Sequence, residues 1–196
     1  MTAPRLIGLA GRAGTGKRTI ARLLCEQHAF VEVSLAEPIK RALAAMLDLH
    51  PAYLEDPAGR ETRLGWLGNT SVQRLMQTLD IGWGRQMIAD DIWPTLARRR
   101  IERLTAQAER LHISGIVVSD LRFDNEADLV RSLGGTVWHI VRPAPPVQAH
   151  SSEAGIAAQP GDRTLDNTGP VDRLETTLDH LLHTPFVHHG GTHAYP

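Results

Sequence analysis

Near its start the chain has a glycine-rich segment with the residue types and spacing of a phosphate-binding loop. The segment, residues 11–19, reads Gly-Arg-Ala-Gly-Thr-Gly-Lys-Arg-Thr. The apolar run 6–10 predicts a buried strand before it, and Ile20 and Leu24, at helical spacing, predict a helix after it. In such a turn the backbone N–H groups point into one concavity, and the helix N-terminus adds partial positive charge. Lys17 can then reach the outer phosphates of a nucleoside triphosphate.

Two features indicate which class of phosphate-binding loop this is. Arg18 stands where the commonest form, G-x-x-x-x-G-K-[ST], has the hydroxyl that holds magnesium, and Thr19 follows one residue later. This order disfavours a GTPase or a motor ATPase, and it resembles the G-x-x-G-x-G-K-x-T loop of nucleoside monophosphate kinases. Lysine is otherwise rare, since only Lys17 and Lys40 occur in the chain. A lysine at the motif position therefore favours phosphate binding over a glycine-rich turn without a ligand.

Length and composition limit the classes of protein that are possible. The 196 residues fit one domain with a substantial core. The net charge of −1 gives no overall field that would favour nucleic acid or an anionic membrane, so neither partner is expected. A single cysteine, Cys25, excludes an internal disulfide framework. Without a signal-peptide pattern or an apolar run of ~20 residues, the sequence predicts a soluble protein of the cytoplasm.

Apolar strand patterns alternate with helical patterns along the chain. Strands are predicted over residues 6–10, 30–34, 116–118, 136–141 and 164–166. Helices are predicted from residue 16 or 17, over 39–49, from residue 70 or 71, and over 94–112, 125–133 and 171–182, with a loop over 56–69 and an interruption at 82–84. This alternation predicts an α/β fold of about five parallel strands with helices on both faces.

Two segments are expected to leave this single domain's core. The core comprises residues 1–35, 113–142 and 163–183, the longer helical excursion spans about 36–112, the shorter one about 143–162, and residues 184–196 are expected to form a disordered tail. Ligands of parallel sheets bind at the carboxyl ends of the strands. The loop 11–19 and the stretches 34–40 and 120–125 should meet there.

Charged residues directly after the strand 116–118 could act on a phosphate. Asp120 could orient hydrated magnesium beside the loop. A helix N-cap is the alternative for Asp120 and for Asp124; the metal role is favoured for Asp120 and the cap for Asp124. Arg122 should project into the same cleft, where a guanidinium can bind phosphate through two hydrogen bonds.

The two excursions contain further candidate residues. Arg85 could bind a phosphate while Trp83 supports a base, although a packed helix junction explains the same residues equally well. His150 and Glu153 could contact a substrate, and the alternative is that their segment caps a short helix. The histidines near the C-terminus lack the cysteine or carboxylate framework of a zinc site.

In their order and spacing these motifs resemble the deoxynucleoside monophosphate kinases of tailed bacteriophages, members of the P-loop nucleoside monophosphate kinase superfamily. The resemblance spans residues 5–182 and is carried by 11–19, 35–40, 75–79, 83–85, 119–126, 133–137, 142–143, 150–153 and 166–169. Glu37 departs from the pattern, which has aspartate there. The resemblance implies a P-loop kinase three-layer sandwich with a helical monophosphate-binding insertion and a short lid.

The resemblance also implies transfer of the γ-phosphoryl group of ATP, with Mg²⁺, to a deoxynucleoside monophosphate, in the host cytoplasm for a phage-encoded enzyme. Lys17, Arg122 and Asp120 would be catalytic, with Asp120 holding the metal through water. ATP would be bound by Gly11, Ala13, Gly14, Thr15, Gly16, Lys17, Arg18, Thr19, Arg142, Asn167 and Gly169. The acceptor would be bound by Lys40, Trp83, Arg85, Arg122, Phe123, His150 and Glu153. The alternatives are a kinase like the dephospho-coenzyme A kinases and a nucleotide switch or ATPase without an acceptor; a homodimer is left open.

Overall fold

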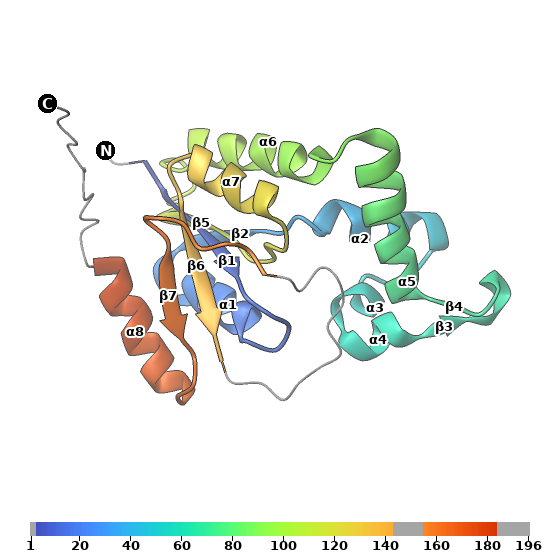
Figure 1. Ribbon diagram of the computed structural model, residues 1–196, viewed down its shortest axis with the longest axis horizontal. Helices are drawn as coiled ribbons and strands as arrows, with labels where there is room; N and C mark the ends of the chain where they lie inside the picture. Colours follow the sequence, from blue (N-terminus) through green and yellow to red (C-terminus); the bar gives the residue numbers. More distant parts are fainter. Residues whose placement is uncertain (1–2, 143–154, 184–196) are drawn as a thin grey trace, which may run out of the picture.

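A five-stranded parallel sheet forms the centre of the protein in the computed structural model, which describes residues 3–142 and 155–183 (Figure 1). The strands are β1 (Arg5–Ala10), β2 (Phe30–Val33), β5 (Gly115–Val118), β6 (Thr136–Val141) and β7 (Arg163–Asp166). Their spatial order is β2-β5-β1-β6-β7, and every neighbouring pair is parallel. Each predicted strand is found within one residue of its predicted ends, which confirms the α/β prediction.

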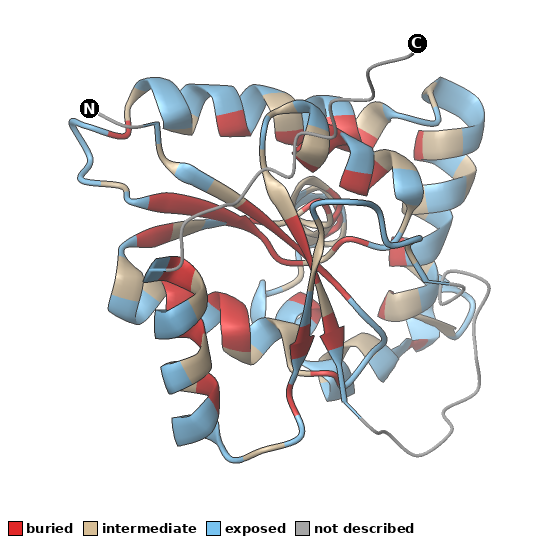
Figure 2. Ribbon diagram, turned by 60° about the vertical axis from the view of Figure 1, so that its left-hand side comes forward, coloured by how far each residue is buried: buried red, intermediate tan, exposed pale blue. Residues whose placement is uncertain are grey.

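Helices cover both faces of this sheet, as predicted. One face is covered by α1 (Lys17–His28) and α8 (Val171–His183), and the other by α6 (Ile92–Ala106) and α7 (Asp124–Ser132). Successive side chains of a strand point to opposite faces. Ile7 and Leu9 of β1 accordingly pack on the side of α1 and α8, whereas Ala10 packs on the side of α6 and α7. The central strands β1 and β5 are therefore buried on both sides (Figure 2).

The segment between β2 and β5 departs from the sheet and is called the insertion, residues 36–112. It contains α2 (Glu37–Leu47), α3 (Ala52–Glu55), α4 (Pro57–Glu61), β3 (Arg63–Leu64), η1 (Gly65–Leu67), β4 (Thr70–Ser71), α5 (Val72–Gln77), η2 (Thr78–Ile88) and α6. Strands β3 and β4 pair antiparallel as a small separate sheet. As predicted, a helix starts just after Ser71, whose hydroxyl accepts a hydrogen bond from Arg74 N at 3.2 Å.

Contrary to prediction, residues 56–69 do not form a plain loop, because they contain α4 and the β3 strand. Asp56 caps α4, its side chain accepting a hydrogen bond from Gly59 N at 3.0 Å. Pro57 follows in the first turn, where a proline is favourable. The Asp-Pro pair is thus the start signal of a short helix.

Also contrary to prediction, the glycines around Trp83 do not interrupt a helix. Helix α5 continues into η2, a wider π-helical segment. Gly84 is buried against Trp93 of α6, and a Cβ at Gly84 would lie 2.4 Å from Trp93 Cζ2. This glycine therefore permits close packing of two helical segments. The helix predicted over 94–112 is α6, which ends already at Ala106.

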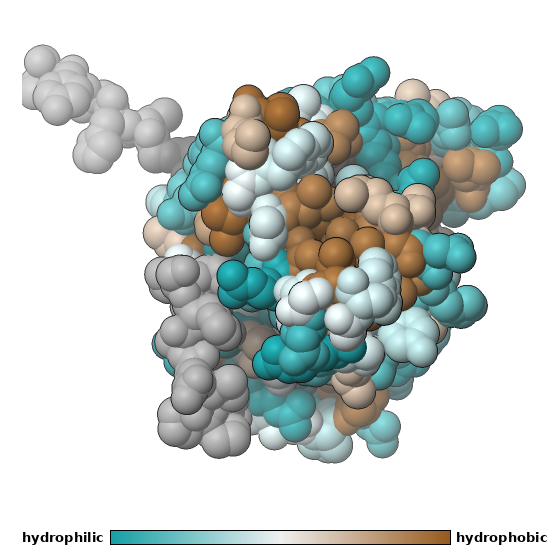
Figure 3. Space-filling view, turned by 90° about the vertical axis from the view of Figure 1, so that its right-hand side faces the viewer, coloured by the Kyte–Doolittle hydropathy of each residue, from teal (hydrophilic) through white to brown (hydrophobic). Residues whose placement is uncertain are grey.

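Several large apolar side chains of the insertion are exposed to solvent. They include Met46, Trp66, Ile81, Trp83, Met87 and Ile88. Figure 3 views the side of the molecule on which the insertion lies in Figure 1, and it shows apolar residues gathered there. In the described part of the chain, no helix has both the length and the apolar character needed to cross a membrane.

Candidate active site

The loop between β1 and α1 contains two glycines at which a Cβ would collide with a neighbour. Gly11 and Gly16 have φ values of 144° and 96°. A Cβ at Gly11 would lie 2.6 Å from Ile140 O, and a Cβ at Gly16 would lie 2.2 Å from Asn167 Nδ2. The loop therefore lies tightly against the ends of β6 and β7. This close approach fixes the turn from which α1 begins.

Side chains hold the loop from two sides. The Nζ of Lys17 donates to Gly11 O, and to Arg12 O at 2.9 Å. Thr15 Oγ1 donates to Arg12 O at 2.9 Å. Asn167 is buried, and its Nδ2 donates to Thr15 O at 2.8 Å. Asn167 thus supports the loop backbone, while the ammonium group of Lys17 lies across the loop carbonyls.

A cavity of about 550 Å³ lies beside this loop. Its lining combines the loop with the strand ends and the insertion. The lining residues are Gly11, Arg12, Ala13, Thr15, Lys17, Arg60, Gln73, Gln77, Asp120, Leu121, Arg122, His139, Ile140, Val141, Arg142, Gly155 and Ile156. The size is typical of a small-molecule site.

The lining is strongly basic although the whole chain carries a net charge of only −1. Among the described residues that line it, the cationic side chains are those of Arg12, Lys17, Arg60, Arg122 and Arg142, and the one carboxylate is that of Asp120. Among the described residues, no carboxylate forms an ion pair with Arg60 or Arg122. Concentrated positive charge in a hollow attracts polyanions. The cavity is therefore suited to bind phosphate groups.

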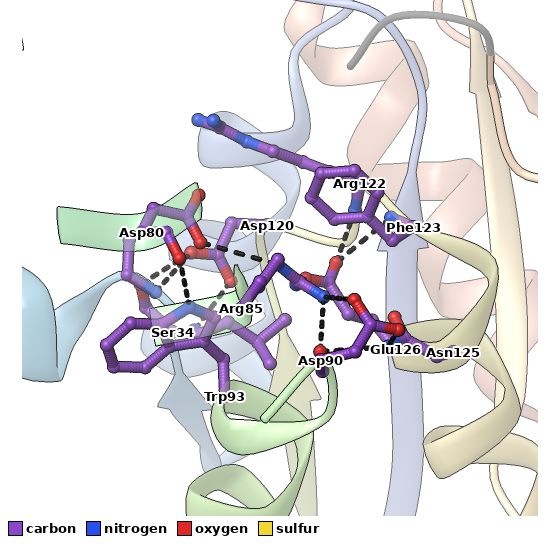
Figure 4. A network of polar contacts seen from close by, with 12 residues as sticks. Ser34, Asp80, Arg85, Asp90, Trp93, Asp120, Arg122, Phe123, Asn125 and Glu126 are labelled. Carbon is purple, nitrogen blue, oxygen red and sulfur yellow. Dashed lines mark hydrogen bonds and ion pairs between the residues drawn. The ribbon is translucent and has the colours of Figure 1, made fainter. Parts of the chain in front are cut away.

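Asp120 links the end of β5 to the start of α2. Its Oδ2 accepts hydrogen bonds from Ser34 Oγ at 2.7 Å and Ala36 N at 3.0 Å, and its Oδ1 accepts one from Leu35 N at 2.8 Å (Figure 4). The carboxylate thus anchors the turn before α2 while it lines the cavity. The alternative role predicted for Asp120 was that of a helix N-cap. The observed contact resembles such a cap, but it stabilises the start of α2 rather than the helix that follows Asp120.

The chain segment 155–162 is fastened to α7 and β6. The carboxylate of Asp162 accepts hydrogen bonds from Arg131 Nη2 at 2.6 Å and Gln159 N at 2.9 Å, and its Oδ2 lies 2.9 Å from His139 Nε2. Burial acts to raise the pKa of Asp162, but these hydrogen bonds outweigh it and the pKa is lowered. The carboxylate therefore keeps His139, on the cavity wall, tied to the segment.

Asp124, expected as a cap, contacts the same segment, because its Oδ1 accepts a hydrogen bond from Ala157 N at 3.1 Å. His150 and Glu153 lie outside the described residues, as does the stretch 184–196. The lid expected over 143–162 is thus described only from residue 155, and its function stays a prediction.

Arg85 lies in a buried cluster between the insertion and α7, and it is not one of the described residues that line the cavity (Figure 4). Its side chain is 7% exposed. Nη2 lies 2.5 Å from Glu126 Oε1, Nη1 donates to Asp90 O at 2.8 Å, and Nε lies 3.5 Å from Asp80 Oδ1. The guanidinium carbon also stands 4.2 Å from the ring centre of Phe123. This geometry supports the alternative interpretation of a packed helix junction.

Glu126 connects this cluster to the backbone of Arg122. Besides its contact with Arg85, its Oε2 accepts hydrogen bonds from Arg122 N at 2.7 Å and Phe123 N at 3.1 Å. Glu126 therefore fixes the backbone from which the Arg122 side chain leaves, and Figure 4 shows that side chain pointing away from the cluster. Burial raises the pKa of Glu126 to about 7, against the lowering effect of these N–H groups and of Arg85.

We expect Glu126→Gln to remove a pH-dependent part of the stability. Below pH 4.5, the ordinary pKa of this side chain, folded and unfolded chains both hold the proton, and the stabilisation is fully present. As pH rises through about 7, the folded protein loses that proton at a cost, so the stabilisation is lost. Between pH 5 and pH 8, the free energy of unfolding of wild type should fall by on the order of 2–3 kcal/mol relative to the variant.

Urea unfolding of both proteins at these two pH values measures the difference. Glu102→Gln is a matched control, because Glu102 lies exposed on α6. A difference between wild type and Glu126→Gln that does not vary with pH would contradict the raised pKa.

Other residues that were expected in the site form contacts between secondary-structure elements. The Nζ of Lys40 lies 2.9 Å from both carboxylate oxygens of Glu55, and Arg18 Nη1 donates to Glu55 O at 3.3 Å. Trp83 packs against Trp93, with ring centres 6.4 Å apart. The described residues that were expected in the site and do not line the cavity are Gly14, Gly16, Arg18, Thr19, Lys40, Trp83, Arg85, Phe123, Asn167 and Gly169.

Sequence reasoning missed five polar residues that line the cavity: Arg12, Arg60, Gln73, Gln77 and His139. Signals existed for three of them, and for Arg12 the signal is its place within the loop motif itself. Gln73 and Gln77 are four residues apart in a stretch predicted to be helical, so they share a helix face. Arg60 carried no such signal, because its segment was predicted to be a loop.

Comparisons with known proteins agree with these features. A family model described as deoxynucleotide monophosphate kinase matches residues 60–178. A protein of Acanthamoeba polyphaga mimivirus that carries this description provisionally is 32% identical over 151 residues, which cover 70% of this chain and 74% of that protein. The deoxynucleotide monophosphate kinase of Enterobacteria phage T4 is 36% identical over 67 residues, covering 34% of this chain and 28% of that protein. The crystal structure of TT1252 from Thermus thermophilus, at 19% identity, shares the fold with a TM-score of 0.51, covering 92% of this chain and 97% of that one.

Proposed function

The chain belongs to the deoxynucleotide monophosphate kinase family, and we propose that the cavity beside Lys17 is where the γ-phosphoryl group of ATP passes to a deoxynucleoside 5′-monophosphate. The products are ADP and a deoxynucleoside diphosphate. One observation carries this proposal: the phosphate-binding loop shares a single basic cavity with side chains of the insertion. A donor on the loop and an acceptor on the insertion side would then have their phosphates facing each other.

The loop side is suited to the triphosphate. Backbone N–H groups of a glycine-rich turn and the N-terminus of α1 favour negative charge there. In the structure, Lys17 donates hydrogen bonds to the carbonyls of Gly11 and Arg12. When ATP binds, the ammonium group of Lys17 would leave these carbonyls and bind the outer phosphate oxygens of ATP.

The transfer step requires alignment and neutralisation of charge, and it forms no covalent enzyme intermediate. Arg122 lines the cavity just beyond β5, and Glu126 fixes its backbone. Its guanidinium can bind two oxygens of the moving phosphoryl group at once. Lys17 and Arg122 together would stabilise the negative charge of the transition state.

The kinase family implies ATP together with Mg²⁺, and the residues present fit an indirect metal role. The described residues contain no group of three or more side chains able to hold a metal ion. Asp120 is the one carboxylate among the described residues that line the cavity. Magnesium usually keeps several waters and binds through phosphates with one or two carboxylates. Asp120 would therefore accept hydrogen bonds from metal-bound water, and the ion would neutralise phosphate charge.

Asp120→Asn is expected to change both stability and magnesium dependence. An amide cannot accept all three hydrogen bonds that the carboxylate accepts from residues 34–36. We expect a loss of roughly 1–3 kcal/mol in the free energy of unfolding, and a higher magnesium concentration for half-maximal rate. Asp124→Asn is the matched control, because Asp124 binds Ala157 and does not line the cavity. A lower melting temperature with unchanged magnesium dependence would leave Asp120 only its anchoring role.

The function itself is tested by ADP release from ATP, with each deoxynucleoside and ribonucleoside monophosphate added in turn. The proposal expects ADP formation only when a deoxynucleoside monophosphate is present. A nucleotide switch or ATPase would release ADP at the same rate without any acceptor. A kinase of the dephospho-coenzyme A type would release ADP when dephospho-coenzyme A is added, and not when the monophosphates are added.

A further inference from the structure

We infer that Arg60, Gln73 and Gln77 form the acceptor subsite: Arg60 binds the phosphate of the deoxynucleoside monophosphate, and the two glutamines hydrogen-bond its base. The inference rests on the proposed function and names the residues on which the acceptor lies. These residues take the acceptor-binding role that the resemblance gave to Arg85 and Trp83. Arg85 belongs to the buried cluster, and Trp83 is partly exposed and packs against Trp93.

The charge of Arg60 is available to a ligand, whereas Arg85 is buried beside carboxyl groups of the protein itself. Arg60 lines the cavity from α4, half-buried, and in the described part of the chain no carboxylate pairs with it. Arg85 has Glu126, Asp80 and Asp90 within 4 Å. A dianionic phosphate gains most from a cation that has no protein counter-charge.

The position of Arg60 relative to the loop is set by contacts of α3 and α4. Arg18, directly after the loop lysine, donates to Glu55 O at 3.3 Å. The carboxylate of Glu55 binds Lys40 of α2 through both oxygens. Asp56 then caps α4. These contacts join the start of α1 to the helix that carries Arg60, which gives a function to the arginine that departs from the common loop motif.

Helix α5 places the two glutamines beside Arg60. Val72 N donates to Thr62 O at 3.2 Å, so the start of α5 lies next to the end of α4. Val72 and Met76 are buried in the core, whereas Gln73 and Gln77, one turn apart, line the cavity. A carboxamide has two donors and one acceptor oxygen, so by turning it can pair with the edges of different bases. The subsite can therefore accept more than one base and still rank them.

The first test is Arg60→Gln, with steady-state kinetics in which each substrate is varied in turn. We expect KM for the deoxynucleoside monophosphate to rise about 10- to 100-fold, and KM for ATP to change by less than about threefold. Arg74→Gln is the matched control on the exposed side of α5, away from the cavity, and should leave both KM values unchanged. Arg60→Lys, which keeps the charge but loses the fork of donors, should lie between wild type and Arg60→Gln.

The second test measures the base preference with Gln73→Ala and Gln77→Ala. The ratios of kcat/KM among the four deoxynucleoside monophosphates should change by about 10-fold for at least one pair of bases. Gln27→Ala is the control, because Gln27 binds Glu175 on the opposite helical layer. Calorimetric titration of each protein with a monophosphate alone gives a readout that does not depend on catalysis.

The outcomes separate this inference from the proposed function. If ADP forms without an acceptor, the proposed function is wrong and the acceptor subsite falls with it. If ADP formation requires a monophosphate but Arg60→Gln raises both KM values equally, or neither, the subsite inference alone is overturned. Unchanged base ratios in both glutamine variants would likewise overturn the role given to Gln73 and Gln77.

Discussion

Replacing Lys17 with alanine is expected to lower kcat about 10³-fold while the fold stays intact. Its ammonium group already lies at the loop, bonded to Gly11 and Arg12 carbonyls, and it lines the basic cavity. In the transition state the same group would neutralise charge that develops on the outer phosphates. Alanine leaves the backbone cradle in place, so ATP should still bind, although more weakly.

Single-turnover and steady-state rates of Lys17→Ala, together with its melting temperature, measure these effects. Arg22→Ala is a matched control on the same helix, because Arg22 is exposed and pairs only with Glu26 among the described residues. Near wild-type turnover in Lys17→Ala would show that the loop does not act on phosphate in the way proposed. A large fall in melting temperature would mean that the lysine mainly supports the loop.

The second large effect is expected for Arg122→Lys, which should lower kcat about 10²-fold with little change in either KM. A lysine keeps the positive charge but cannot form the two parallel hydrogen bonds of a guanidinium. Because that contact strengthens as charge moves to the phosphoryl oxygens, its loss acts on the transition state. Glu126 binds the backbone N–H of Arg122, so the substitution leaves this anchor in place.

Varying ATP and the monophosphate separately distinguishes this role from ground-state binding. Arg98→Lys serves as control, because Arg98 lies on α6 and binds Ser132 and Glu102 outside the cavity. A raised KM for one substrate with unchanged kcat would assign Arg122 to the binding of that substrate. The contrast with Arg60→Gln, where KM for the acceptor is expected to rise, then separates the two arginines.

Arg60 and Arg85, both in the insertion, show why nearby sequence is a poor guide to whether an arginine has a counter-charge in the folded protein. Arg85 stands beside a tryptophan and two glycines, a pattern that fits a ligand site and a packed helix junction equally well. In the folded protein it lies against Glu126, a residue of α7 that is distant in sequence. Arg60 stands in a segment without a recognisable motif, yet its side chain lines the cavity. Whether a cation is free for a ligand depends on which carboxylates the fold brings to it.

The sequence by itself determined the sheet, its parallel character and the phosphate-binding loop. These features depend on local patterns, since buried strands need short apolar runs and the loop needs glycines at fixed spacing before a helix. The predicted ends of the strand that begins at Gly115, and the predicted start of the helix at Lys17, therefore lie within one residue of the observed ones. The order of motifs along the chain also indicated the kinase family.

Only the tertiary structure decided which polar side chains share the cavity. The fold brings Asp120 into contact with Ser34, and Glu126 into contact with Arg85. It also places Gln73 in the lining of the same cavity as the loop. Each of these relations connects residues that are distant in sequence, and no local pattern encodes the distance between them. The burial of Arg85 and the open charge of Arg60 follow from the packing of the insertion against the core, because desolvation and counter-charges are properties of the folded surroundings rather than of the residue type.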